Sequence, residues 1–425
     1  MANTITVPLV APPDTLRVEV AYYDEEERFA FGKTLGRDIL GGASKELVIP
    51  TPDFCANYLY YKLRDGVRGY SSHDDLVGKW AHALVELDGQ VEFVDGSVRL
   101  IQTNGTSRGT SERLGEAIGL SVASRLHRLH EGDWTRVPET NSRKTFDFQR
   151  SIASDGRRFI LLESKGSSVE DNRLKPSTVT EHKRSIKDKK RDATPEERAD
   201  SVLYGTIGVL DDRPESTARC WLVDPPAGVA GDPVRFKLLT RLEYIARYIS
   251  LLGARSQLAA ALRTRLSALL AAGDYRALDG IVLRTGSDAE FSTETYDMFG
   301  RHNQWFGSKS VVTDGPAGGH VFAVNARVLL FIGIREQLIG LAASQDFREI
   351  IEYEFDAGVV EKTVECVVPQ ARFKREFARF IALPERNRRA SAGYLRFPLS
   401  GLLYYCQSGL VYGVLPVPES WRTAS

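Results

Sequence analysis

Hydrophobic and polar positions along the first hundred residues indicate both strands and helices. Residues 16–23, LRVEVAYY, alternate with the period of a strand that has one buried face. Residues 74–87 instead repeat apolar positions at helical spacing, and residues 91–101 place an Asp-Gly pair between two alternating runs, which predicts a hairpin. Residues 1–104 are therefore expected to form a mixed α+β region.

The next segment changes from loop to helix to paired strands. The polar stretch 103–111 ends in Ser and Thr residues that suit a helix N-cap, and residues 112–130 have helical spacing. Residues 145–153 and 157–166 are typical of two strands joined by an Asp-Gly turn. An apolar run in the second of these strands places it near the centre of its sheet.

Two further strands are expected at 202–210 and 219–225, after a basic stretch that is predicted to be helical. The order helix, hairpin, helix, strand, strand is typical of an α/β sandwich. We therefore expect an α/β domain over residues 105–226.

A stretch rich in Pro and Gly divides the rest of the chain into segments. The stretch 225–233, PPAGVAGDP, is typical of a linker. A helical connector is expected over 234–272, with a possible break at Gly253. Residues 275–425 are expected to form a separate α+β domain, because they combine a strand pattern at 320–332 with a helix near 335–343.

Overall composition is that of a globular protein with no formal net charge at neutral pH. Hydrophobic residues make up 42% and charged residues 26%, while Lys plus Arg and Asp plus Glu each number 56. Nucleic-acid affinity would therefore need a local basic patch. The four cysteines lie far apart and are expected to be reduced and buried. A signal peptide and a membrane span are not indicated, so we expect a cytoplasmic protein with no membrane partner.

Candidate chemistry is concentrated on the predicted hairpin. Glu163 and Lys165 are two residues apart on its second strand, so both side chains leave the same face, and Asp147 lies on the neighbouring strand. Phosphodiester hydrolysis needs a divalent ion bound by hard oxygen ligands and a cation near the reacting groups. These three residues can supply both requirements.

The same residues resemble the PD-(D/E)XK nuclease superfamily. The resemblance covers about residues 110–226 and includes Glu116 in RLGEAIG, Asp147 in TFDFQ and Glu163-Ser164-Lys165 in ILLESKGS. It implies a restriction-endonuclease-like α/β/α core in which Asp147 and Glu163 bind Mg²⁺ or Mn²⁺. Lys165 would then orient or activate the attacking water, and Glu116 would assist the metal shell. Phe146, where the family often has proline, precedes Asp147.

Simpler interpretations of these residues remain open. A Glu-x-Lys tripeptide occurs by chance in many proteins, so Glu163 and Lys165 could instead be solvated at an ordinary strand end. Glu116 could likewise decorate a solvent-exposed helix face. Context favours a site, because placing two charges on a buried strand costs free energy unless they are paired or bind a metal.

A basic run follows the proposed active strand. Residues 173–191 contain eight Lys or Arg residues against Glu181 and Asp188, a local excess of six. Such a run is often a solvated helix face, but here it lies where a phosphate backbone would pass. The residues expected to contact nucleic acid are Lys183, Arg184, Lys187, Lys189, Lys190 and Arg191.

The leading hypothesis is a divalent-metal-dependent nuclease that hydrolyses DNA. By association with the family, the resemblance implies an effector in prokaryotic defence against phage or plasmids, working with a partner protein or a guide-bearing complex. Residues 275–425 would regulate it or bind a partner or nucleic acid. Two alternatives remain: a catalytically inactive nuclease-fold subunit that binds nucleic acid or a protein, and a nuclease acting on RNA.

Overall fold

Two compact units make up the computed structural model. It describes residues 12–35, 40–41, 45–63, 73–102, 106–136, 149–152, 159–192, 201–223, 232–252, 256–284, 311–313, 317–324, 327–384, 389–391 and 393–422. One unit consists of the described parts of 12–65 and 86–240 and is called the mixed-sheet unit; the other consists of those of 66–85 and 241–425 and is called the curled-sheet unit. The described residues thus form a mixed α/β structure with two sheets.

The mixed-sheet unit contains a nine-stranded sheet in the described residues, with the order β3-β4-β1-β9-β8-β7-β6-β5 and β2 paired to β1. β1 runs parallel to β4 and β9, and β7 runs parallel to β8, whereas the other neighbours are antiparallel. The strands are β1 (Thr15–Tyr22), β2 (Lys45–Pro50), β3 (Val91–Val94), β4 (Ser97–Leu100), β5 (Thr135–Arg136), β6 (Gln149–Ile152), β7 (Phe159–Ser168), β8 (Ser201–Leu210) and β9 (Arg219–Val223).

One helix of this unit, α4, lies close to the predicted range 112–130, whereas α1 and α2 are not predicted by the sequence pattern. Ser107 caps α4 by accepting a hydrogen bond from the backbone of Thr110, and Arg128 ends the helix in the left-handed conformation, before the predicted residue 130. The helices are α1 (Glu25–Leu35), α2 (Thr51–Leu63), α4 (Arg108–His127), the 3₁₀ helix η2 (Glu131–Asp133) and α5 (Ser177–Asp192). The helices α3 (His73–Asp88) and α7 (Pro233–Leu252) each contain a boundary between the units.

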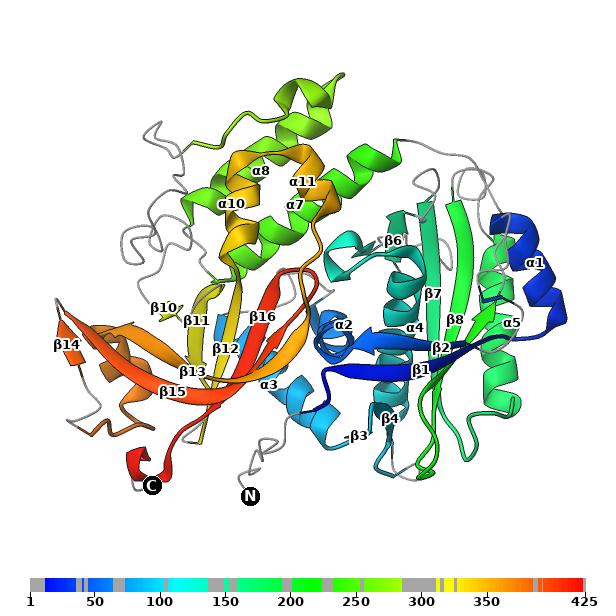
Figure 1. Ribbon diagram of the computed structural model, residues 1–425, viewed down its shortest axis with the longest axis horizontal. Coiled ribbons are helices and arrows are strands. Elements are labelled where there is room, and N and C mark those ends of the chain that lie inside the picture. The colour runs from blue at the N-terminus through cyan, green and yellow to red at the C-terminus, as the bar shows by residue number, and fades with distance from the viewer. Residues whose placement is uncertain are drawn as a thin grey trace. The chain divides into compact units, whose positions relative to one another are not determined.

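Glycine allows α4 to lie directly on the sheet. A Cβ atom on Gly115 would overlap the backbone of Gly166 in β7, and one on Gly119 would overlap the side chains of Ser164 and Thr206. Figure 1 shows α4 running along β7 and β8. The residues of β7 that face α4 are therefore the even-numbered ones, including Ser164 and Gly166.

Several sequence predictions are confirmed. The hairpin β3–β4 turns at Asp95 and Gly96, whose φ angles of 51° and 75° are the left-handed values that an Asp-Gly turn provides. β6 and β7 pair antiparallel, and β7 lies between β6 and β8, so the apolar strand is internal in the sheet. α4, β6, β7, α5, β8 and β9 follow one another in the expected order.

The curled-sheet unit is built on an antiparallel sheet in the order β13-β10-β11-β12-β16-β15-β14. β13 pairs with β15 as well as with β10, so the sheet curls back on itself (Figure 1). Its inner face encloses aromatic and aliphatic side chains that include Phe331, Phe397 and Leu415. The strands are β10 (Val311–Thr313), β11 (Ala317–Ala323), β12 (Val328–Arg335), β13 (Gly358–Pro369), β14 (Arg389–Ser391), β15 (Tyr394–Tyr405) and β16 (Leu410–Pro416).

Helices accompany this sheet as well. α10 confirms the helix predicted near 335–343, and α7 and α8 confirm a helical stretch that breaks near Gly253, which itself lies outside the described residues. The helical elements are α8 (Gln257–Ala271), the 3₁₀ helices η3 (Tyr275–Leu278) and η6 (Glu419–Trp421), α10 (Glu336–Ser344), α11 (Phe347–Glu352), α12 (Gln370–Arg372) and the π-helical turn η4 (Phe373–Phe377).

The units divide the chain differently from the predicted domains. Strands β1 to β4 belong to the same sheet as β7, so no sheet boundary falls at residue 104. α3 belongs largely to the curled-sheet unit, where Trp80 is fully buried and its ring lies 6.1 Å from that of Tyr412 in β16. The single strand predicted at 320–332 is two antiparallel strands, β11 and β12, because the chain reverses between them.

All four cysteines are buried free thiols, as the sequence predicts. Within the described ranges, none of the helices combines the length and apolar character needed to cross a bilayer.

Candidate functional site

Strand β7 carries the candidate Glu-x-Lys pair in the interior of the mixed sheet. Since Ser164 and Gly166 face α4, Glu163 and Lys165 leave the opposite face of the strand. The parallel partner strand has the same alternation, because Gly205 opposite Glu163 contacts Ile186 of α5. The predicted shared face of Glu163 and Lys165 is thus the face that α5 covers.

Glu163 is a completely buried carboxylate bound by two lysines. Its side chain has no exposed surface, and its Oε1 atom lies 2.7 Å from Nζ of Lys165 and 2.9 Å from Nζ of Lys189. The Lys165 and Lys189 side chains are 21% and 10% exposed. Two ammonium groups thus lie beside one buried carboxylate, whose burial is costly unless it is paired in this way.

α5 contributes a histidine next to this pair. Nε2 of His182 lies 3.2 Å from the carbonyl oxygen of Gly166, on the strand that carries Lys165. Burial lowers the pKa of His182 most strongly, and the positive charge of Lys165 lowers it further, while the hydrogen bond to Gly166 raises it. The imidazole is therefore biased toward its neutral form beside the Glu163–Lys165 pair.

Sequence reasoning missed His182 as a neighbour of the site, although a signal was present. His182, Ile186 and Lys189 are separated by four and three residues, which is the spacing of one helix face. Because Ile186 is fully buried against β8, that face is the one turned toward the sheet. Helical spacing on the basic run would have separated these inward residues from the rest.

The next face of α5 is neutralised by acidic residues at the start of α1. Lys183 binds Asp24 and Glu27, and Lys187 lies 2.8 Å from Glu27 and 3.7 Å from Glu26. Partial burial alone would raise the pKa of Asp24, but the hydrogen bonds and charges around it, Lys183 foremost, outweigh this and leave that pKa below its ordinary value. Lys183 and Lys187 thus already have counter-charges within the protein.

Outward-facing cations on α5 are fewer than the sequence suggests. Arg184 is exposed, and Arg191 is exposed but pairs with Asp188. The side chain of Lys190 lies outside the described residues. Of the six residues predicted to contact nucleic acid, Arg184 and Arg191 are exposed, and the side chain of Lys187 is 39% exposed but ion-paired with Glu26 and Glu27.

Glu116 comes from a helix on the other side of β7. It is only 2% exposed, so it does not decorate a solvent-exposed face. The adjacent Gly115 contacts the α4-facing side of the sheet, whereas Glu163 and Lys165 leave the α5-facing side. The structure therefore gathers Glu163, Lys165, Lys189 and His182 on one face and positions Glu116 on the helix that covers the other.

Asp147, the second predicted metal ligand, lies outside the described residues. The described part of the strand predicted at 145–153 is β6, which pairs with β7 through Arg150 opposite Leu161. Glu163 alone is the predicted metal ligand that the structure describes. It supplies the hard carboxylate oxygen that Mg²⁺ and Mn²⁺ prefer, and an ion on Oε1 would have to replace an ammonium group there.

Another acidic group in the described residues has ligand atoms close together. Carboxylate oxygens of Asp24, Glu26 and Glu27 lie within 4.8 Å of one another, but Lys183 and Lys187 bind the same group. Those ion pairs explain why three carboxylates can gather there without a metal ion.

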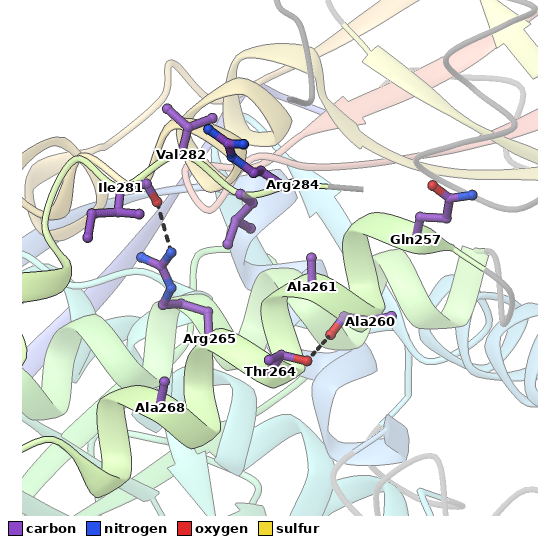
Figure 2. Close-up of a pocket in the computed structure, with 10 residues that line it drawn as sticks. Gln257, Ala260, Ala261, Thr264, Arg265, Ala268, Ile281, Val282 and Arg284 are labelled. Atoms are coloured by element: carbon purple, nitrogen blue, oxygen red, sulfur yellow. Dashed lines mark hydrogen bonds between the residues drawn. The ribbon is translucent and has the colours of Figure 1, made fainter. Parts of the chain in front are cut away.

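The curled-sheet unit has a hollow of about 610 Å³ between α8 and residues 281–284. Figure 2 shows that small alanine side chains of α8 form part of its wall. Arg265 donates from its guanidinium to the carbonyl oxygens of Leu278 and Ile281, both at 2.9 Å. Its described lining contains no carboxylate, histidine or cysteine.

Comparisons with models of protein families, with curated proteins and with solved structures found no match.

Proposed function

We propose that the mixed-sheet unit is a divalent-metal-dependent nuclease of the PD-(D/E)XK type with a restriction-endonuclease-like core. The observation that carries this proposal is the Glu163–Lys165 pair, held on one face of an internal strand with 2.7 Å between Oε1 and Nζ. The order helix, antiparallel pair, helix, parallel strand around that pair also supports it.

Each residue has a defined part in the proposed reaction. Glu163, together with Asp147, would hold Mg²⁺ or Mn²⁺, which when bound polarises the phosphate and lowers the pKa of water. Lys165 would hold the attacking water or the developing negative charge, because its ammonium stays beside Glu163. The sheet and α5 would exclude bulk water, which strengthens these electrostatic interactions. Glu116 would act from the opposite face through α4, so its part is the least direct.

DNA is the proposed substrate, and prokaryotic defence against phage or plasmids is the proposed setting. Both rest on the resemblance described above. Arg184 and Arg191, which α5 presents at the surface, would contact the phosphate backbone. A protein partner or a guide-bearing complex would select the target.

A second candidate function is a catalytically inactive subunit in which the nuclease-like unit serves as a scaffold. The observation that favours it is the complete burial of Glu163 under two ammonium groups. Such a cluster can be a purely structural ion pair that fixes α5 on the sheet. A nucleic-acid or protein partner would then bind without cleavage.

Purified protein incubated with plasmid DNA or labelled RNA, with and without Mg²⁺ or Mn²⁺, tests the activity. The proposal predicts metal-dependent cleavage of DNA that is lost in Asp147→Asn, Glu163→Gln and Lys165→Met. Glu352→Gln, which removes an exposed carboxylate in the curled-sheet unit, is the matched control and should cleave normally. Cleavage of RNA but not of DNA would show that RNA is the substrate and would leave the proposed chemistry unchanged.

A metal-binding assay on the same variants separates the two candidate functions. A nuclease binds Mn²⁺ through Glu163, so Glu163→Gln should weaken Mn²⁺ binding. A scaffold shows no Mn²⁺ binding that depends on Glu163, and no cleavage of either substrate.

A further inference from the structure

Both lysines of the cluster use the same carboxylate oxygen. Nζ of Lys165 and Nζ of Lys189 lie 2.7 Å and 2.9 Å from Oε1 of Glu163. A carboxylate oxygen has two lone pairs, and each ammonium group uses one of them. A metal ion that binds Oε1 must therefore displace one of these two lysines.

Charge also argues for an exchange. With both lysines in place, a divalent ion on Oε1 would bring two further positive charges beside their ammonium groups. Like charges a few ångströms apart in a partly desolvated site repel strongly, since the interaction is weakly screened there. Release of one ammonium group reduces this repulsion.

The two lysines differ in how they are anchored. Lys165 lies in the middle of β7, where pairing with β8 continues on both sides of it. Lys189 lies in the last turn of α5, three residues before the helix ends at Asp192. The end of a helix is held by fewer hydrogen bonds than an internal strand, so Lys189 can move away at lower cost.

We propose that Lys189 occupies, in the metal-free protein, the place on Glu163 that the divalent ion takes in the active one. This inference rests on the proposed function. The ammonium contacts the buried carboxylate in the metal-free protein, and metal binding exchanges this Lys189–Glu163 contact for a metal–oxygen contact. No covalent bond changes, and Lys165 stays beside Glu163. Lys189 thereby lowers the apparent affinity of the site for metal.

Mn²⁺ binding to the full chain, followed by the electron paramagnetic resonance signal of free Mn²⁺, tests this without reference to activity. Lys189→Met should bind Mn²⁺ about tenfold more tightly than the wild type, because the ion no longer competes with an internal ammonium group. Arg184→Met is the matched control, since it removes one positive charge from an exposed position on the same helix. It should leave Mn²⁺ affinity within about twofold of the wild type.

A double variant shows where the tighter binding occurs. Glu163→Gln/Lys189→Met should lose the gain, because the carboxylate that binds the ion is gone. Thermal melts of all variants, together with Lys189→Arg, which keeps the charge and should keep the wild-type affinity, show whether a change comes from misfolding.

The outcomes distinguish this inference from the proposed function. Mn²⁺ binding that depends on Glu163 but is equal or weaker in Lys189→Met than in Arg184→Met would overturn the role of Lys189 and keep the metal site. Mn²⁺ binding in none of the variants, or binding unaffected by Glu163→Gln, would overturn both. Binding in Lys189→Met but not in the wild type would support the exchange most strongly.

Discussion

At the scale of single residues, the central feature is one buried carboxylate shared by two ammonium groups. The sequence predicts the Glu163–Lys165 pair, because residues two apart on a strand leave the same face. It does not identify Lys189 as a partner of Glu163, because that contact joins residues 26 apart through the packing of α5 on β7. Its place in the basic run suggests contact with nucleic acid, whereas in the structure its ammonium group binds Glu163.

His182 provides a pH-dependent test of this face. Its pKa is lowered from the ordinary 6.5, first by burial and then by Lys165, so the unfolded chain binds a proton that the folded chain does not. Between the folded pKa and 6.5 the free energy of unfolding therefore rises with pH, and the stabilisation is complete above 6.5. The advantage in melting temperature of the wild type over His182→Gln should shrink between about pH 7.5 and about pH 5.5.

An NMR titration of the imidazole checks the cause. In Lys165→Met the pKa of His182 should rise toward its ordinary value while staying below it, because burial remains. Lys187→Met also removes one positive charge, but from α5. Lys187 is not among the groups that shift the pKa of His182, so that pKa should stay unchanged in this variant. Equal pKa values of His182 in the two variants would show that Lys165 does not lower this pKa.

At the scale of elements, local patterns predict well where an alternation, a helical spacing or an apolar run marks a single element. β1, α3, the β3–β4 hairpin, α4, β7 and β8 all lie close to their predicted ranges. The run 320–332 is apolar across a chain reversal, so its pattern does not show where β11 ends and β12 begins. Pairing between β1 and β9, about 200 residues apart in the chain, leaves no local signal either.

The close approach of α4 to β7 gives a stability prediction. Gly115→Ala should lower the free energy of unfolding by about 2 kcal/mol or more, because the new methyl group overlaps the backbone of Gly166. Gly109→Ala lies in the first turn of the same helix, where a Cβ meets only the end of the Arg113 side chain at 3.9 Å, and should change stability by less than about 1 kcal/mol. Chemical denaturation followed by circular dichroism compares them, and equal effects would show that the helix does not lie this close to the strand.

The surface of α5 gives a binding prediction. Arg184 is exposed on this helix, so Arg184→Ala should reduce the log–log salt dependence of duplex DNA binding by about 0.9. Arg348→Ala removes an exposed arginine from the curled-sheet unit and should leave the slope unchanged. Fluorescence anisotropy over a range of salt concentrations measures both, and equal slopes would remove Arg184 from the DNA-binding surface.

At the scale of the whole molecule, the curled-sheet unit is assembled from segments far apart in the chain. Its members include α3, and Trp80 of that helix is fully buried beside Tyr412. Composition and local pattern do not predict this arrangement, because it depends on which apolar faces meet after the chain has folded. Residues 275–425 therefore do not carry all of their unit's structure.

A chain ending at Ala272 tests this organisation. It would keep α3, α7 and α8 and lose every strand from β10 to β16. Trp80 and the buried face of α7 would be left uncovered, so the shortened protein should aggregate during size-exclusion chromatography. A monodisperse, folded product would show that these helices are stable without the curled sheet.

The proposed nuclease activity depends on whether Glu163 and Lys165 form a metal-dependent catalytic site. The most direct measurement is the single-turnover rate of cleavage of labelled duplex DNA in Mg²⁺ by the wild type, Glu163→Gln and Lys165→Met, with melting temperatures recorded for each. We expect cleavage by the wild type that disappears with a chelator, and a cleavage rate that is lower by about 10²-fold or more in both folded variants. Cleavage at the wild-type rate in both variants, or a wild-type protein that cleaves neither DNA nor RNA with Mg²⁺ or Mn²⁺, would contradict this proposal.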